Sequence, residues 1–160
     1  MILAVSVMAL SLATAGLEGQ EATETLTPAA PAAGASEWHV VSRSATTAYM
    51  IDVNGIRQQG GVTTALLARV PATGSASDRA HSVTHMSFQC AANQSKSGEE
   101  IYYAPDGSEE ERIPNDYDFE AIPANSLDDH AKAFVCNGDR SSRSYQTIAD
   151  FIAAGRPTRN

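Results

Sequence analysis

The chain has 160 residues and a formal net charge of −8, which arises from 19 acidic and 11 basic side chains. This length suffices for one domain with a substantial core but not for two domains of ordinary size. The negative charge argues against the basic face that nucleic acid or anionic lipid requires, so we expect no nucleic-acid partner.

The first 15 residues have the features of a secretory leader. Residues 2–15 carry no charge and end in Ala13-Thr14-Ala15, the small-x-small pattern that signal peptidase reads. The apolar stretch is shorter than the ~20 residues that a membrane-spanning helix needs. We therefore expect cleavage after Ala15, no integral membrane anchor, and a periplasmic or secreted mature protein.

Residues 16–36 are rich in Ala, Thr, Glu, Pro and Gly and contain no aromatic side chain, valine or isoleucine. Such a segment cannot bury enough surface to offset the entropy lost on ordering. We expect a disordered linker that is stiffened by Pro28 and Pro31, with a recognition peptide as the alternative.

The folded domain is expected to start near Trp38, where segments rich in β-branched and aromatic residues alternate with turn signals. Trp38 and Val40 face one way in the first segment. Tyr49, Ile51 and Val53 alternate with other residues in the second segment, as in a strand with one buried face.

The remaining strand candidates share this texture and are residues 62–70, 80–90, 99–104 and 109–113. Residues 65–68 could also be helical, but the flanking Val and Thr favour a strand. The pair Asp106-Gly107 is a strong hairpin signal between the last two candidates. Five or six strands with mostly short connections predict an antiparallel meander.

A helix is predicted after residue 126. Asn125 or Ser126 can cap its first turn, and apolar side chains then recur at helical spacing. Cys136 falls in its last turn, and Gly138 ends it.

A second amphipathic stretch covers residues 145–154 and stops at Gly155. The sequence leaves open whether this stretch packs on the domain or projects from it. We assign residues 37–138 to a β-rich domain and residues 139–160 to a C-terminal helical extension.

Cys90 and Cys136 are the only cysteines of the chain. In an exported protein a disulfide is the default, whereas a redox-active pair usually has the adjacent C-x-x-C arrangement. A bond that closes such a long loop contributes about 4 kcal/mol in the loop-closure model. The predicted fold class is therefore α+β, an antiparallel sheet of five or six strands with a C-terminal helix tethered to it by a disulfide.

Several motifs in this order resemble the bacterial surface-adhesin protein E family over about residues 37–138. They are Trp38 with Val40, Tyr49-Met50-Ile51-Asp52-Val53-Asn54-Gly55-Ile56-Arg57, Cys90, Tyr102-Tyr103 with Asp106-Gly107, Ile122-Pro123 with Ser126, and Cys136. The resemblance implies a sheet with one helix held against it by the disulfide. The founding member is a surface lipoprotein that binds host matrix and plasma proteins, so the resemblance also implies an adhesin-like role.

The sequence contains only weak evidence for a metal-binding or catalytic site. His81 and His85 have H-x-x-x-H spacing, but on a strand they lie about 13 Å apart, too far to share one zinc ion. The acidic run at residues 106–118 lacks the alternating order of a calcium loop, which favours a solvated hairpin. No nucleophile elbow or phosphate-binding loop is present in the sequence. We expect no catalytic residue, no bound metal and no cofactor.

Two functions remain open. The first is a non-enzymatic envelope or secreted interaction module that contacts a protein partner through sheet edges or a groove beside the helix. The same edges allow a homodimer, and the net charge is compatible with a basic or metal-bridged partner. The second is a small periplasmic hydrolase or ligand-binding protein with a site assembled from His81, His85, Asp106 or Asp52.

Overall fold

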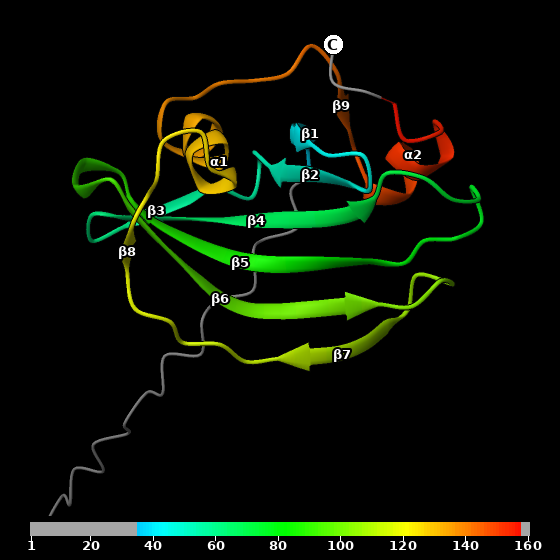
Figure 1. Ribbon diagram of the computed structural model, residues 1–160, viewed down its shortest axis with the longest axis horizontal. Helices are drawn as coiled ribbons and strands as arrows, with labels where there is room; N and C mark the ends of the chain where they lie inside the picture. Colours follow the sequence, from blue (N-terminus) through cyan, green and yellow to red (C-terminus); the bar gives the residue numbers. More distant parts are fainter. Residues whose placement is uncertain (1–34, 158–160) are drawn as a thin grey trace, which may run out of the picture. The chain divides into compact units, whose positions relative to one another are not determined.

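The computed structural model describes residues 35–157 (Figure 1). The expected leader, residues 1–15, and nearly all of the expected linker, residues 16–36, lie outside the described residues. Within residues 35–157, no helix is both long enough and apolar enough to cross a bilayer. The first strand begins at Trp38, where the sequence predicts it.

Within residues 35–157 the fold is a nine-stranded antiparallel sheet with two short α-helices, which confirms the predicted α+β class. The strands are β1 (Trp38–Arg43), β2 (Thr47–Asp52), β3 (Arg57–Gln59), β4 (Val62–Pro71), β5 (His81–Gln89), β6 (Gln94–Tyr103), β7 (Glu109–Ile113), β8 (Glu120–Ala121) and β9 (Ser144–Tyr145). Their order is β7-β6-β5-β4-β2-β1-β9, while β3 pairs with β4 and β8 with β6. Figure 1 shows β4 to β7 side by side, with β7 outermost. The long strands therefore follow one another as the predicted meander.

Three short strands raise the count above the expected five or six. β3, β8 and β9 have only two or three residues each, too few for a periodicity to be read from the sequence. β6 also begins at Gln94 rather than at residue 99, although its first residues are polar. Pairing with β5, for example Ser95 opposite Phe88, holds these residues in the sheet. The neighbouring strand, rather than local propensity, sets the start of β6.

One face of the sheet packs against α1 (Leu127–Cys136). The Ser126 hydroxyl caps this helix by accepting a hydrogen bond of 3.1 Å from the amide of Asp129. The buried core between α1 and the sheet contains Val41, Ile51, Val53, Ala65, Leu67, Met86, Phe88, Ile122, Ala131, Phe134 and Val135.

The opposite face packs against α2 (Ile148–Ala153). Ala65 and Leu67 of β4 belong to the α1 core. Ala68 and Val70 of the same strand belong to a second core, because successive side chains of a strand point to opposite faces. The buried residues of this second core are Trp38, Val40, Ala48, Met50, Ala68, Val70, Val83, Ile148, Phe151 and Ile152.

Both faces of β1 and β2 are buried, which corrects the expectation of a single buried face. Ile51 of β2 lies in the α1 core and Met50 in the α2 core, and both side chains are fully buried. In β1, Val41 likewise lies in the α1 core and Val40 in the α2 core. The physical reason is α2, which covers the face that a half-exposed sheet would leave to water.

The C-terminal segment packs on the domain, a question that the sequence left open. β9 extends the sheet beside β1, with Tyr145 opposite Trp38. Thr147 and Asp150 then form a capping box, in which each side chain accepts a 3.0 Å hydrogen bond from the other residue's amide. The helix begins at Ile148 rather than at residue 145, because β9 takes up the preceding residues.

Candidate interaction surface

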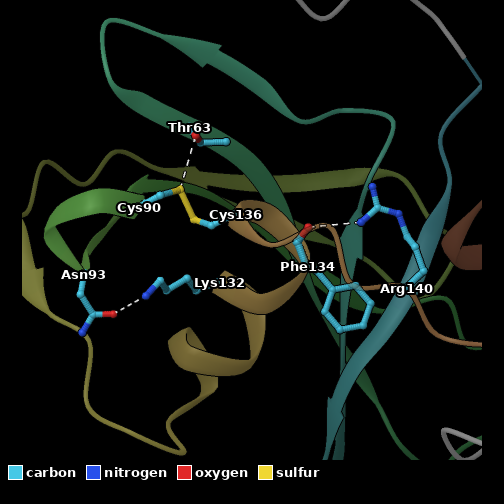
Figure 2. Close-up of a disulfide and its surroundings, with 7 residues drawn as sticks. All are labelled: Thr63, Cys90, Asn93, Lys132, Phe134, Cys136 and Arg140. Carbon is cyan, nitrogen blue, oxygen red and sulfur yellow. Dashed lines mark hydrogen bonds between the residues drawn. A yellow bond between two sulfur atoms is a disulfide. The ribbon is translucent and has the colours of Figure 1, made fainter.

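Helix α1 is attached to the β5–β6 region by three links at successive turns, and Figure 2 shows the two nearer the end of the helix, at Lys132 and Cys136. The three links are Cys136 with Cys90, Lys132 with Asn93, and Asp128 with Ser95. Because residues four apart lie on one side of a helix, all three links hold the same stripe of α1. The predicted disulfide is thus present, and it joins the end of the helix to the end of β5 across 46 positions in the sequence.

The last turn of α1 has further contacts around the disulfide (Figure 2). The Arg140 guanidinium donates a 3.2 Å hydrogen bond to the carbonyl of Phe134. This bond satisfies one of the carbonyls that a helix end leaves without an internal partner. The Thr63 hydroxyl lies 3.6 Å from Sγ of Cys90. The helix is therefore a fixed part of the module rather than a movable cover.

Two of the residues considered for a dispersed catalytic site, Asp52 and His81, lie on separate parts of the sheet. Asp52 ends β2 and His81 begins β5, and β4 lies between these two strands. The register offsets the two residues by about four positions, or ~13 Å along the strands, in addition to two strand spacings. No single ligand of ordinary size contacts both side chains.

Asp52 and Asp106 each stabilise a local turn. The buried carboxylate of Asp52 accepts hydrogen bonds from the amides of Glu37, at 2.9 Å, and Asn54, at 3.2 Å. Asp106 accepts a 2.8 Å hydrogen bond from the amide of Ser108 and a second one from its hydroxyl. These bonds favour the carboxylate and lower the pKa of Asp106. Both carboxylates are therefore engaged by the backbone.

The two histidines of β5 have different surroundings. The His81 ring stacks on Tyr103 with 4.4 Å between ring centroids, and its Nδ1 lies 2.7 Å from the carbonyl of Arg79. Burial lowers the pKa of His81. His85 is exposed. Among the described residues, no group of three or more His, Cys, Asp or Glu side chains is placed to hold a metal ion.

A hollow of about 170 Å³ opens beside the first turn of α1. It is lined by Leu67, Arg69, Thr84, Met86, Ser97, Leu127 and Asp128. Its two charged groups already have partners, since Asp128 accepts from Ser95 and Arg69 lies 3.8 Å from the Glu100 carboxylate. None of the four candidate residues lines this hollow, so it does not revive the dispersed catalytic site.

One edge of the sheet is open. β7 has β6 as its only strand neighbour within residues 35–157, and β8 pairs with the other end of β6. We call residues 109–121, from β7 through β8, the outer edge (Figure 1). An edge strand presents unpaired N–H and C=O groups along its free side, which makes it a template for another strand.

The hairpin turn that precedes β7 places the strand at this edge. Asp106 holds the amide of Ser108, and the Gly107 amide donates a 2.8 Å hydrogen bond to the carbonyl of Ala104. Gly107 has a φ of +87°, a conformation that glycine adopts without the strain of a side chain. A Cβ at this position would lie 3.3 Å from Cδ of Arg79, so the Arg79 side chain would have to shift slightly to admit it.

The outer edge exposes apolar side chains. All five residues of β7 are exposed, and the large hydrophobic residues with exposed surfaces in the described part of the chain are Ile113, at 37%, and Tyr117, at 61%. Tyr117 lies in the connection from β7 to β8. Exposed apolar groups that are rimmed by polar residues are typical of protein contact sites.

The outer edge is also strongly acidic. Its 13 residues contain six carboxylates and one arginine, a net charge of −5 out of the −8 of the whole chain. Arg112 lies beside Glu109 and Glu99, which lowers the pKa of Glu109 and raises that of Arg112. Asp116 is paired with Lys96 at 3.0 Å. The other four carboxylates, which have no ion pair with any described residue, are Glu110, Glu111, Asp118 and Glu120.

The sequence predicts a solvated hairpin in this region and does not predict that Ile113 and Tyr117 are exposed contact residues. The sequence did contain a sign of this exposure. Ile113 follows four charged residues, whereas a strand with one buried face would have an apolar residue at every second position. Whether such a residue is exposed depends on which strand ends the sheet. That order is a tertiary property.

Comparison with known proteins identifies a family. A family model described as surface-adhesin protein E matches residues 38–137. The matched segment runs from the start of β1 to one residue beyond Cys136, so it contains the outer edge and the disulfide. No curated protein and no solved structure matches the chain.

Proposed function

Because this chain belongs to the surface-adhesin protein E family, we propose that it is an exported, non-enzymatic module that binds another protein through its outer edge. The family match covers 100 of the 160 residues, from 38 to 137. Membership supports an adhesin-like interaction role for the module. The partner contacts the edge of this sheet that the described strands of the chain leave uncovered.

The observation that carries this proposal is the location of the exposed hydrophobic residues. Ile113 ends β7 and Tyr117 lies in the connection from β7 to β8, so both belong to the outer edge. Elsewhere in the described residues the large apolar side chains are buried or partly buried, most of them in the two cores. An interface anchored on one aromatic and one aliphatic side chain is typical of protein recognition.

Export is supported by two features. The Cys90–Cys136 disulfide persists in the oxidising compartments outside the cytoplasm. The sequence also begins with the uncharged leader-like segment that ends at Ala15. We place the mature module in the periplasm or outside the cell.

The absence of catalysis is supported by the contacts of the candidate groups. Asp52 and Asp106 bind turn amides, and His81 packs on Tyr103. Each of these side chains stabilises the fold where it lies, and β4 lies between the strands that carry Asp52 and His81.

The proposal is tested by measuring binding of the mature chain, residues 16–160, to an immobilised panel of matrix, plasma and envelope proteins. The test variant is I113S/Y117S, and the control is Q58S on the exposed strand β3. We expect at least one partner whose affinity falls about tenfold in the double variant, as hot-spot residues at an interface imply, and is kept in the control. No bound partner, or equal binding by both variants, would overturn the proposal.

A further inference from the structure

We propose that the outer edge takes a basic, extended segment of the partner as an additional antiparallel strand beside β7. This inference rests on the proposed function and names the chemistry of its partner. It follows from three properties of the same edge, namely free backbone groups, an apolar anchor and unpaired negative charge.

The backbone of β7 is available for strand addition. The strand has five residues, all exposed, and β6 occupies one of its two sides. Five residues span about 17 Å, enough to pair with a short extended peptide. Every strand pair of this sheet is antiparallel, so an added antiparallel strand continues the existing pattern.

The other edge of the sheet is less suited to this role. It ends in β9, which has two residues and pairs only with the first two residues of β1. Very short edge strands are one way in which proteins block unwanted pairing. β7 is the longer template.

The register of β7 defines what a partner strand would meet. Glu111 lies opposite Tyr102 and Ile113 lies opposite Glu100, so Glu111 and Ile113 are on the same face of the sheet. In an antiparallel partner, the residue that faces Ile113 comes two positions before the residue that faces Glu111. The matching sequence is therefore an apolar residue, any residue, and then Lys or Arg.

The charge of the edge favours a basic partner over two other possible occupants, a second copy of the chain and the chain's own N-terminal segment. A second copy would place two β7 strands together with three glutamates and one arginine each, and like charges directly opposite each other destabilise a strand pair. The chain's own segment at residues 16–34 carries three glutamates and no basic residue, so it has the same sign of charge as the edge. A basic segment instead gains attraction from Glu110, Glu111, Asp118 and Glu120.

The probe for this inference is a labelled ten-residue peptide with a central Thr-Val-Thr-Lys-Thr, measured by fluorescence anisotropy with the mature chain. We expect binding that weakens between about 10 and 150 mM salt, since the screening length falls from ~30 to ~8 Å. A peptide with Glu in place of Lys should bind at least about threefold more weakly.

Charge reversal in the protein provides the matched variants. E111K should weaken binding of the Lys peptide by roughly three- to tenfold and restore binding of the Glu peptide. D139K makes the same change of net charge at an exposed position between α1 and β9, and it should leave both affinities nearly unchanged. Equal effects of E111K and D139K would overturn the assignment of the charge contact to β7.

Backbone methylation separates strand addition from simple charge attraction. Two peptides carry N-methyl groups on alternate residues in the two opposite frames. Only one frame should abolish binding, because every second N–H of an added strand faces β7. Equal binding by both methylated peptides would overturn strand addition.

The remaining outcomes separate this inference from the proposed function. If the peptide does not bind but a panel protein still depends on Ile113 and Tyr117, the basic-strand partner is wrong and the interaction edge stands. A dimer of the free chain that competes with the peptide would assign the edge to a second copy and overturn the inference. If no panel protein depends on the edge, the proposed function is overturned, and the inference that rests on it is overturned as well.

Discussion

The guanidinium of Arg43, at the end of β1, donates a 2.8 Å hydrogen bond to the backbone carbonyl of Arg156, 113 positions later in the chain. The same guanidinium donates to the carbonyl of Ala72 at 2.8 Å. Arg43 therefore connects the first strand, the loop after β4 and the segment after α2. The family match ends at residue 137, so one of these three parts lies beyond it.

Replacement of Arg156 should loosen this connection. Its buried guanidinium donates to the carbonyls of Gly74, Ser75 and Asp78, while its Nε has no partner among the described residues. We expect R156A to lower the free energy of unfolding by about 1–3 kcal/mol, because the three loop carbonyls lose their charged donor. Urea denaturation measures this loss.

The control for this variant is R143A, which removes an exposed arginine in the same C-terminal segment. Hydrogen exchange should also show faster exchange at residues 74–78 in R156A only. An R156A protein as stable as R143A would mean that the buried arginine does not hold the loop.

The second core should contribute as much stability as the first. Phe151 of α2 and Phe134 of α1 are both fully buried, on opposite faces of the sheet. We expect F151A and F134A each to cost about 3–5 kcal/mol. Guanidinium denaturation should show a single transition in both variants, since β1 and β2 belong to both cores.

Y117A serves as the control for aromatic truncation, because Tyr117 is exposed. Its effect should stay within about 0.5 kcal/mol. A loss below about 1 kcal/mol in F151A would show that α2 is an accessory to the fold and would contradict the two-core arrangement.

Loss of the disulfide should be severely destabilising but should leave α1 in place. The bond between Cys90 and Cys136 closes a long loop, and its removal restores denatured-state entropy equivalent to about 4 kcal/mol. We expect C90A/C136A to melt at a markedly lower temperature while retaining its helical circular dichroism, because Lys132 still binds Asn93. Thermal melts of both forms measure the difference.

Thiol titration of the periplasmic protein completes this test. Under denaturing conditions the wild-type chain should show no free thiol until reductant is added. Two free thiols in a protein with unchanged melting temperature would contradict both the pairing and its stabilising role.

The stability of the protein should fall on the acid side of neutrality through His81. Burial against Tyr103 lowers the pKa of His81 in the folded state, so the unfolded chain binds the proton more readily. The contribution of the neutral ring is present above the ordinary histidine pKa of about 6.5 and is lost as the pH falls through the folded-state pKa. Denaturation midpoints at successive pH values from 7.5 downward measure this loss.

H81F removes the titrating group while keeping a ring that can stack on Tyr103. We expect the acid-side decrease to become smaller in H81F and to persist in H85Q, a control at an exposed position of the same strand. Identical pH profiles for wild type and H81F would show that this histidine does not couple folding to protons.

Local patterns in the sequence were sufficient for the long strands, apart from the start of β6, for α1 and for the choice of cysteine pair. Alternation around Tyr49 and Ile51 depends on neighbours two residues away, and the cap at Ser126 on a residue three positions later. Such signals act within one element, so they can be read without the fold. The disulfide followed because an exported chain with two cysteines has only one intramolecular pairing.

The tertiary structure alone decided which faces and edges meet water. The second buried face of β2, carrying Met50, depends on Phe151 of α2, which lies about a hundred residues later. The exposure of Ile113 depends on β7 being the last strand of the sheet, and the separation of Asp52 from His81 depends on β4 lying between their strands. Burial is a property of surfaces brought together by strand order and helix packing, and no local periodicity carries that information.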